Sequence, residues 1–227
     1  MKLVLLPGMD GTGVLFEDFI SSYPGESLVI PLPMEGEQDY MSLASSLADR
    51  FPKGDFILLA ESFSGGIVPY LLEHASERIR GIIFVAGFLS PPSRALLFLA
   101  RMFPIAKLAA FSSARFMHKE MFLGRNATDE LVTRFVQVIR SVPEKILKQR
   151  LKEMAKMRLP LKPISIPAAY IQAMDDKLVN ANKWPEFLKI FTDIQRYQIK
   201  GPHFILQADP VGAAGLVSEV VSRLTCV

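Results

Sequence analysis

The chain has 227 residues, of which 50% are hydrophobic and 22% charged, a length that fits one compact domain or a core domain with a modest insertion. This apolar content excludes a largely disordered chain. Arg101, Pro104 and Lys107 interrupt the most apolar stretch, Arg94 to Phe111, so no membrane-spanning segment is expected. The single cysteine, Cys226, excludes an internal disulfide framework and a zinc site made of cysteines. No secretory signal is evident, and we expect a cytoplasmic protein.

The net charge of +3 is unevenly distributed along the chain. The segment from Arg101 to Arg158 holds 13 basic and 5 acidic residues and so carries +8, which leaves −5 for the remaining residues. Such a segment can attract anionic substrates or a lipid surface, although solvated helix faces are its commoner explanation. No nucleic-acid-binding motif accompanies the charge, so we expect no nucleic-acid partner. The oligomeric state is not predicted.

The first half of the chain alternates strands and helices. Short apolar runs that end at proline or glycine signals are typical of buried strands, and they predict strands at Leu3–Leu6, Leu28–Ile30, Phe56–Ala60 and Ile79–Ala86. A Ser/Gly turn follows the third run, and Ile67–Ala75 is then expected to be helical. Strand, helix and strand in this order indicate βαβ units and therefore a parallel sheet.

A helical block follows, from Pro92 to about Arg158. Apolar residues recur there at helical spacing on one face: Leu131, Phe135, Val138, Ile139 and Val142. Thr128 is the expected N-cap, with acidic residues in the first turn. Pro143 is placed to start a further helix, which carries Leu147, Leu151 and Met154.

The strand pattern returns after this block. We predict strands at Ile166–Ala173 and Ile194–Ile199, a helix near Ala181–Phe191 and a last helix that ends near Leu224. The chain therefore has an α/β pattern into which a helical block is inserted.

The segment Ala60-Glu61-Ser62-Phe63-Ser64 directly follows the third predicted strand. It fits small-x-Ser-x-small, the form of a nucleophile elbow, in which the tight strand-to-helix turn leaves no room for larger flanking side chains. The helix that follows points its N-terminus at the serine, which favours the oxyanion formed on attack. The pattern can also be centred on Ser64, but Ser62 is favoured because it follows the apolar run after one residue. Glu61 occupies the variable position and is assigned no chemical role.

Two further polar segments follow predicted strands: Asp175-Asp176-Lys177 and Gly201-Pro202-His203-Phe204. Open α/β sheets bind ligands at the carboxyl ends of their strands, and Ser, Asp, His is a known order of triad residues along a chain. In a triad, His203 takes the serine proton and one aspartate orients the imidazole. Each residue alone is more often a turn or helix-start residue, so the coincidence of three segments carries the prediction. His74 and His118 are weaker candidates, because each lies in a predicted helix among charged residues.

A glycine-rich turn, Pro7-Gly8-Met9-Asp10-Gly11-Thr12-Gly13, follows the first predicted strand. A backbone N–H of this turn, together with that of Phe63, would form an oxyanion hole. The turn lacks Gly-Lys-Ser/Thr, and its glycines do not fit G-x-G-x-x-G, so we expect no phosphate or dinucleotide site. Three scattered histidines offer no metal site, and neither a metal nor another cofactor is predicted.

Taken together, these motifs resemble the α/β-hydrolase superfamily, and the resemblance runs from Leu3 to about Val220. It implies that Met9 donates the oxyanion N–H. The loop Asp176-Lys177-Leu178-Val179 matches the superfamily's Asp-x-x-Val, which favours Asp176 over Asp175, and Gly-Pro-His-Phe matches its Gly-x-His-Phe. The run Leu-Pro-Gly-Met-Asp-Gly-Thr-Gly with Glu-Ser-Phe-Ser-Gly is similar to an esterase-like and acyltransferase-like subgroup.

The resemblance implies an α/β fold: a mostly parallel sheet of about six strands flanked by helices, because the chain begins at what resembles the third strand of the full fold. The helical block lies where this superfamily inserts a helical cap, after the fourth predicted strand. The expected division is therefore a core of residues 1–90 and 161–227 and a cap or lid of residues 91–160. Ser64 replaces the glycine that is usual at its position.

Phenylalanine and methionine are frequent between Gly87 and Pro160, and an apolar, flexible lid over a serine suits an acyl chain. Most of these side chains are expected to pack the cap itself: Phe88, Phe98, Met102, Phe103, Phe111, Phe116, Met117, Met121, Phe122, Met154 and Met157. We predict a carboxylesterase acting on small-molecule esters of hydrophobic acyl groups through Ser62, Asp176 and His203. An acyltransferase or thioesterase with the same triad stays open, as does a non-catalytic ligand receptor.

Overall fold

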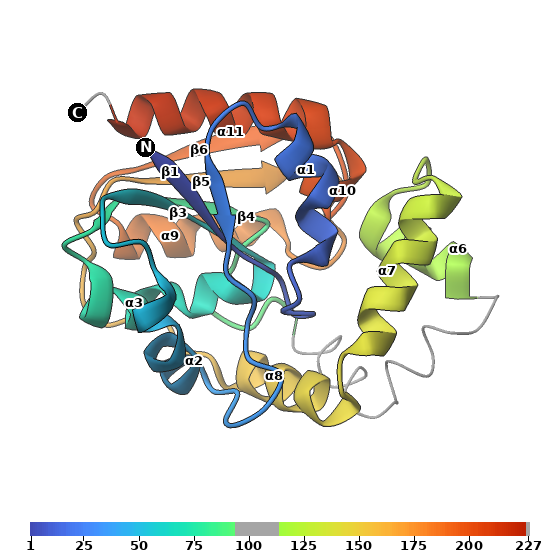
Figure 1. The fold of residues 1–227 in the computed structure, drawn as a ribbon, viewed down its shortest axis with the longest axis horizontal. Helices are drawn as coiled ribbons and strands as arrows, with labels where there is room; N and C mark the ends of the chain where they lie inside the picture. Colours follow the sequence, from blue (N-terminus) through green and yellow to red (C-terminus); the bar gives the residue numbers. More distant parts are fainter. Residues whose placement is uncertain (94–113, 226–227) are drawn as a thin grey trace.

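The computed structural model describes residues 1–93 and 114–225. Its centre is one sheet of six parallel strands in the order β2-β1-β3-β4-β5-β6 (Figure 1). The strands are β1 (Lys2–Leu6), β2 (Ser27–Val29), β3 (Phe56–Glu61), β4 (Ile79–Val85), β5 (Ala168–Ala173) and β6 (Ile194–Ile199). This confirms the α/β fold with a parallel sheet, and every strand predicted from the sequence is present, with ends shifted by at most two residues.

The burial of each strand follows its place in the sheet. All six residues of β3 and all six of β5 are buried, as expected for strands covered by helices on both faces. The edge strand β6 is polar and partly exposed, with Gln195, Arg196 and Gln198 among its six residues. The buried runs of β1, β3, β4 and β5 mark the inner strands, at whose carboxyl ends ligands bind in such sheets. The expectation of a buried strand is wrong for β2, which is partly exposed because it lies at the other edge of the sheet.

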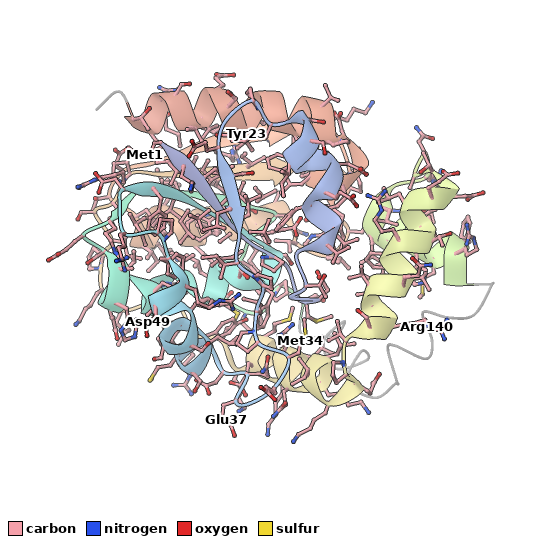
Figure 2. The ribbon with its side chains drawn as sticks, in the orientation of Figure 1. Met1, Tyr23, Met34, Glu37, Asp49 and Arg140 are labelled. Carbon is pink, nitrogen blue, oxygen red and sulfur yellow. The ribbon has the colours of Figure 1, made fainter. Side chains whose placement is uncertain are left out.

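Helices cover both faces of the sheet, and each face has its own apolar core. Successive strand residues point to opposite faces, so Ile57 and Leu59 of β3 pack in one core and Leu58 and Ala60 in the other. The first core receives α1 (Glu17–Ser22), α10 (Ile205–Ala208) and α11 (Pro210–Thr225); the second receives α2 (Tyr40–Leu47), α3 (Val68–Ala75) and α9 (Trp184–Ile190). Figure 2 shows side chains filling the space between these layers, with Glu37, Asp49 and Arg140 at the periphery.

Several helical turns are short and 3₁₀ in geometry. They are η1 (Val14–Phe16), η2 (Ala48–Arg50), η3 (Ser62–Gly66) and η5 (Ala181–Lys183). The last precedes α9, so the helix predicted near 181–191 is a 3₁₀ turn followed by an α-helix. Within the described ranges, no helix is both long and apolar enough to cross a membrane.

Between β4 and β5 the described residues form α6 (Ala114–His118), the π-helical turn η4 (Lys119–Leu123), α7 (Asp129–Ser141) and α8 (Glu144–Lys156). Thr128 caps α7 as predicted, since its side chain accepts a hydrogen bond from the Leu131 N–H at 3.2 Å, and Pro143 directly precedes α8. The segments η4, α7 and α8 share a third apolar core, which also includes Leu15 and Phe204 of the α/β part. In Figure 1, α6 and α7 lie beside the sheet and α8 beneath it.

The predicted cap of residues 91–160 overlaps a range that the structure does not describe. Residues 94–113, 226 and 227 are outside the described ranges, and with them the most apolar stretch of the sequence and Cys226. The same holds for four residues of the proposed apolar lid: Phe98, Met102, Phe103 and Phe111. The division into core and cap stays a prediction.

Candidate active site

The segment predicted as a nucleophile elbow forms a sharp turn at the end of β3. Glu61 is the last strand residue, and Ser62 begins η3 with a φ of +49°. Only Ala86 shares a positive φ among the other non-glycine residues described. A side chain held in this left-handed region costs about 1–3 kcal/mol, so the surrounding packing maintains it. Gly66 is part of that packing, because a Cβ there would lie 2.6 Å from the Tyr40 ring.

The structure brings Ser62, Asp176 and His203 together from the ends of three strands. The Ser62 hydroxyl lies 2.9 Å from His203 Nε2, and His203 Nδ1 lies 2.8 Å from Asp176 Oδ2. The other carboxylate oxygen, Asp176 Oδ1, accepts the backbone N–H groups of Leu178 and Val179 at 2.8 and 2.9 Å. With Nδ1–H donating to Asp176, the unprotonated Nε2 faces the Ser62 hydroxyl and can accept its proton.

The alternatives from the sequence occupy different places. Ser64 is fully buried, and its hydroxyl donates to the Pro7 carbonyl at 2.5 Å. Asp175 is exposed, and its backbone N–H donates to Gly201 O at 2.8 Å. The hydrogen bonds of the His203 ring in the described structure therefore go to Ser62 and Asp176, the residues that the sequence favoured.

The two other histidines lie away from these groups. His74 is on α3, where its Nε2 lies 3.4 Å from the Ser45 hydroxyl. His118 is buried against the rings of Phe122 and Phe135, a packing that the expectation of charged surroundings did not include. The apolar face of α7 covers it, a tertiary contact that its charged neighbours in sequence do not reveal.

The glycine-rich loop after β1 lies directly against the elbow. A Cβ on Gly8 would be 3.8 Å from Ser62 Cβ and 3.4 Å from a carboxylate oxygen of Glu61. The Gly11 N–H donates to Gly8 O at 3.0 Å and closes a turn. Because the carbonyl and N–H of a trans peptide point in opposite directions, the Met9 N–H faces out of this turn. Met9 and Phe63, the two predicted oxyanion donors, thus lie on adjoining segments.

Glu61 is a buried acid next to the candidate triad, and sequence reasoning assigned it no role. It is 2% exposed, and burial raises the pKa of its carboxyl to about 7, against the lowering effect of a hydrogen bond from Gln207. Burial also disfavours the charged imidazole of His203, but the charge and hydrogen bond of Asp176, with a smaller effect of Glu61, raise its pKa overall. Glu61 and His203, two titratable groups whose charges influence each other's pKa, therefore lie on either side of Ser62.

A second group that sequence reasoning missed is Arg150 of α8, whose guanidinium donates to the carbonyl oxygens of Met9 and Asp10. Its position in the sequence offered a signal, since it lies three residues after Leu147 and four before Met154, on their apolar face. In the described ranges, no cluster of three or more His, Cys, Asp or Glu side chains could hold a metal ion.

No family model matches the chain, and no curated protein matches its sequence. Solved structures, by contrast, do match the fold of this chain. A hydrolase from Pseudomonas aeruginosa PA01 superposes with a TM-score of 0.79 at 16% identity, over 97% of this chain and 89% of the other. An esterase from Exiguobacterium antarcticum gives 0.78 at 14% identity, over 98% and 92%, and MenH from S. aureus gives 0.76 at 15%, over 99% and 94%. The chain has the α/β-hydrolase fold.

Proposed function

We propose that this protein is a serine hydrolase that cleaves carboxylic esters of hydrophobic acyl groups through an acyl-enzyme. One observation carries the proposal: the hydrogen bonds from Ser62 to His203 and from His203 to Asp176 form one continuous chain. In this arrangement a histidine activates a serine hydroxyl and a carboxylate orients the histidine. The fold, shared with a hydrolase and an esterase, supports the same class of reaction.

In the first half of the reaction, Ser62 Oγ attacks the carbonyl carbon of the ester while His203 Nε2 accepts the hydroxyl proton. The π electrons of the carbonyl move to its oxygen, and the N–H groups of Met9 and Phe63 stabilise the resulting negative charge. When this intermediate collapses, the bond to the alcohol oxygen breaks and His203 returns the proton to the leaving alkoxide. The acyl group stays bonded to Ser62.

In the second half, His203 removes a proton from water, whose oxygen attacks the acyl carbon. Collapse of the second intermediate breaks the bond to Ser62 Oγ, which regains the proton from His203, and the carboxylic acid leaves. Asp176 stays ionised throughout and stabilises the imidazolium that forms in each half.

Apolar side chains next to the three residues support a hydrophobic acyl group. The Phe204 ring lies 5.3 Å from the His203 ring and 5.3 Å from that of Phe135, and Phe122 completes the cluster. Met9 packs against two of the apolar cores. Apolar surroundings of this kind favour acyl chains over small polar groups. In a series of p-nitrophenyl esters we expect kcat/KM to peak at a medium-length acyl chain, whereas a steady fall from acetate onwards would contradict this preference.

A fluorophosphonate probe with peptide mass mapping tests the proposed catalysis. Such a probe reacts with a serine that has both a base and an oxyanion hole. We expect the adduct on Ser62, still on Ser62 in Ser64→Ala, and lost in His203→Ala. Turnover should fall by about 10⁴ in Ser62→Ala and His203→Ala. A folded protein without an adduct on Ser62 would overturn the proposal and favour a non-catalytic ligand receptor.

A further inference from the structure

Arg150 connects α8 to the loop that follows β1. Its side chain is entirely buried. Nη1 donates to the carbonyl oxygens of Met9 at 2.8 Å and Asp10 at 3.0 Å. The remaining donors bind a second loop, Nη2 to Pro33 O at 2.7 Å and Nε to Gln38 Oε1 at 2.9 Å. All four acceptors are neutral oxygens, so this cation is held by dipoles.

The choice of arginine has a physical reason. Burial lowers the pKa of Arg150 to about 10, and Asp10 works against this effect, so the side chain is charged at neutral pH. Removing a charge from water costs several kcal/mol, and here the planar guanidinium offsets this with donors in fixed directions. A lysine has a single nitrogen and cannot reach both loops in the same way.

Arg150 also contacts the residue after the candidate nucleophile. Its Cζ lies 5.9 Å from the centroid of the Phe63 ring, within the range of a cation–π contact. One side chain from α8 therefore touches both Met9 and Phe63, whose backbone N–H groups form the oxyanion hole in the proposed mechanism.

We propose that Arg150 is a positioning residue that sets the direction of the Met9 N–H in the oxyanion hole. The inference rests on the proposed function and adds a residue to it. Gly11 holds the Gly8 carbonyl on one side of Met9, and Arg150 holds the carbonyls of Met9 and Asp10 on the other. The peptide planes on both sides of Met9 thus cannot rotate without breaking one of these hydrogen bonds.

The packing at Gly11 shows how closely the guanidinium fits against this loop. A Cβ at Gly11 would lie 2.3 Å from Arg150 Nη1, which is far inside van der Waals contact. An oxyanion donor that is displaced by about 1 Å loses about 100-fold in rate. A residue that never touches substrate can therefore control kcat through this loop.

The test compares Arg150→Ala and Arg150→Lys with Arg134→Ala. Arg134 joins α7 to α1 through Asp18 at 2.8 Å, so its loss weakens the attachment of the same helical segment without touching the Met9 loop. We expect both Arg150 variants to lose about 100-fold in kcat and in the rate of fluorophosphonate labelling. KM should change little, because the Met9 N–H that Arg150 positions stabilises the oxyanion in the transition state and not the bound substrate. Arg134→Ala should keep both rates.

Rescue with guanidinium separates positioning from a general structural role. Arg150→Ala leaves a space of guanidinium shape, so added guanidinium, at concentrations below those that unfold the protein, should restore much of the labelling rate of this variant. It should not accelerate wild type or Arg134→Ala. If Arg150→Ala does not fold, Arg150→Lys decides, with its melting temperature measured beside its labelling rate.

The outcomes are distinct. Labelling of folded Arg150 variants at the wild-type rate overturns the proposal and leaves the proposed function intact. An equal loss in Arg150→Ala and Arg134→Ala overturns it too, since attachment of the helical segment would then be the cause. A wild-type protein that the probe does not label at Ser62 overturns the proposed function, and the role of Arg150 falls with it.

Discussion

Gln207 Nε2 donates a hydrogen bond of 3.0 Å to Glu61 Oε1, and both side chains are shielded from water. The pair links α10 to the last residue of β3, directly before Ser62. Because burial outweighs this hydrogen bond, the pKa of the Glu61 carboxyl lies at about 7 instead of 4.5. An acid that titrates near neutral pH is thus built into the turn that carries the candidate nucleophile.

The stability of the protein should depend on pH through Glu61. The pKa of its carboxyl is about 7 in the folded protein, whereas the ordinary value, which applies to the unfolded chain, is 4.5. Between these two pH values the folded state therefore binds more protons than the unfolded state. The contribution of Glu61 to the free energy of unfolding is therefore fully present below pH 4.5 and is lost as the pH rises through 7. We expect Glu61→Gln to gain about 3 kcal/mol relative to wild type between pH 4 and pH 8, measured by denaturant unfolding.

The control for this experiment is the same exchange at Glu37, which lies at the surface (Figure 2). It reports what a glutamate-to-glutamine change does away from the buried pair. A difference between Glu61→Gln and wild type that is the same at both pH values would contradict the assignment to Glu61.

Glu61 should also influence the titration of His203. The negative charge of Glu61 contributes to raising the pKa of His203, as the charge of Asp176 does more strongly. Glu61→Gln removes a charge that favours the imidazolium, so the His203 pKa should fall, and the acid limb of kcat/KM should move to lower pH. Imidazole NMR signals measure the pKa directly in a protein with three histidines. An upward or absent shift would exclude this coupling.

Asp175 and Asp176 form a matched pair for testing the role of the carboxylate. Asp176→Asn keeps the shape of the side chain but cannot stabilise the imidazolium, so we expect kcat to fall by about 10⁴. Asp175 is exposed, and Asp175→Asn should leave kcat close to wild type. Steady-state kinetics on one ester compares the two. Equal effects, or a larger loss in Asp175→Asn, would move the role away from Asp176.

Two glycines with nearly the same positive φ separate backbone strain from steric conflict. Gly11 and Gly36 have φ values of +73° and +75°, but only Gly11 has neighbours in the way, and nothing lies within 4 Å of a Cβ at Gly36. Gly36→Ala should cost about 1–2 kcal/mol of stability, and Gly11→Ala clearly more, because its Cβ meets Arg150. Denaturant unfolding measures both.

The double variant Gly11→Ala/Arg150→Ala gives this comparison a further check. Removal of the guanidinium should make the Gly11→Ala change cheaper than in the wild-type background. Equal costs in both backgrounds would mean that the neighbour at Gly11 is not Arg150.

Local patterns predicted the strands well. Phe56–Ala60 is apolar and bounded by turn residues, and the strand ends within one residue of that run. The helices α1 and α2 were missed. The second is rich in serine, with the sequence YMSLASSL, and serine competes with helical hydrogen bonds in solution. Packing of Leu43, Ala44 and Leu47 against the sheet stabilises it, together with the Asp39 cap, a signal that the sequence did contain.

The sequence by itself determined the parallel α/β architecture and the short segments from which Ser62, Asp176 and His203 come, because strand periodicity and tight-turn chemistry are local properties of neighbouring residues. Only the tertiary structure decided which side chains face one another. Arg150 and Met9 are 141 positions apart, and Gln207 and Glu61 are 146 apart. Such pairs depend on how whole helices pack, and burial, which decides the pKa of Glu61 and the charge environment of Arg150, exists only once the chain is folded.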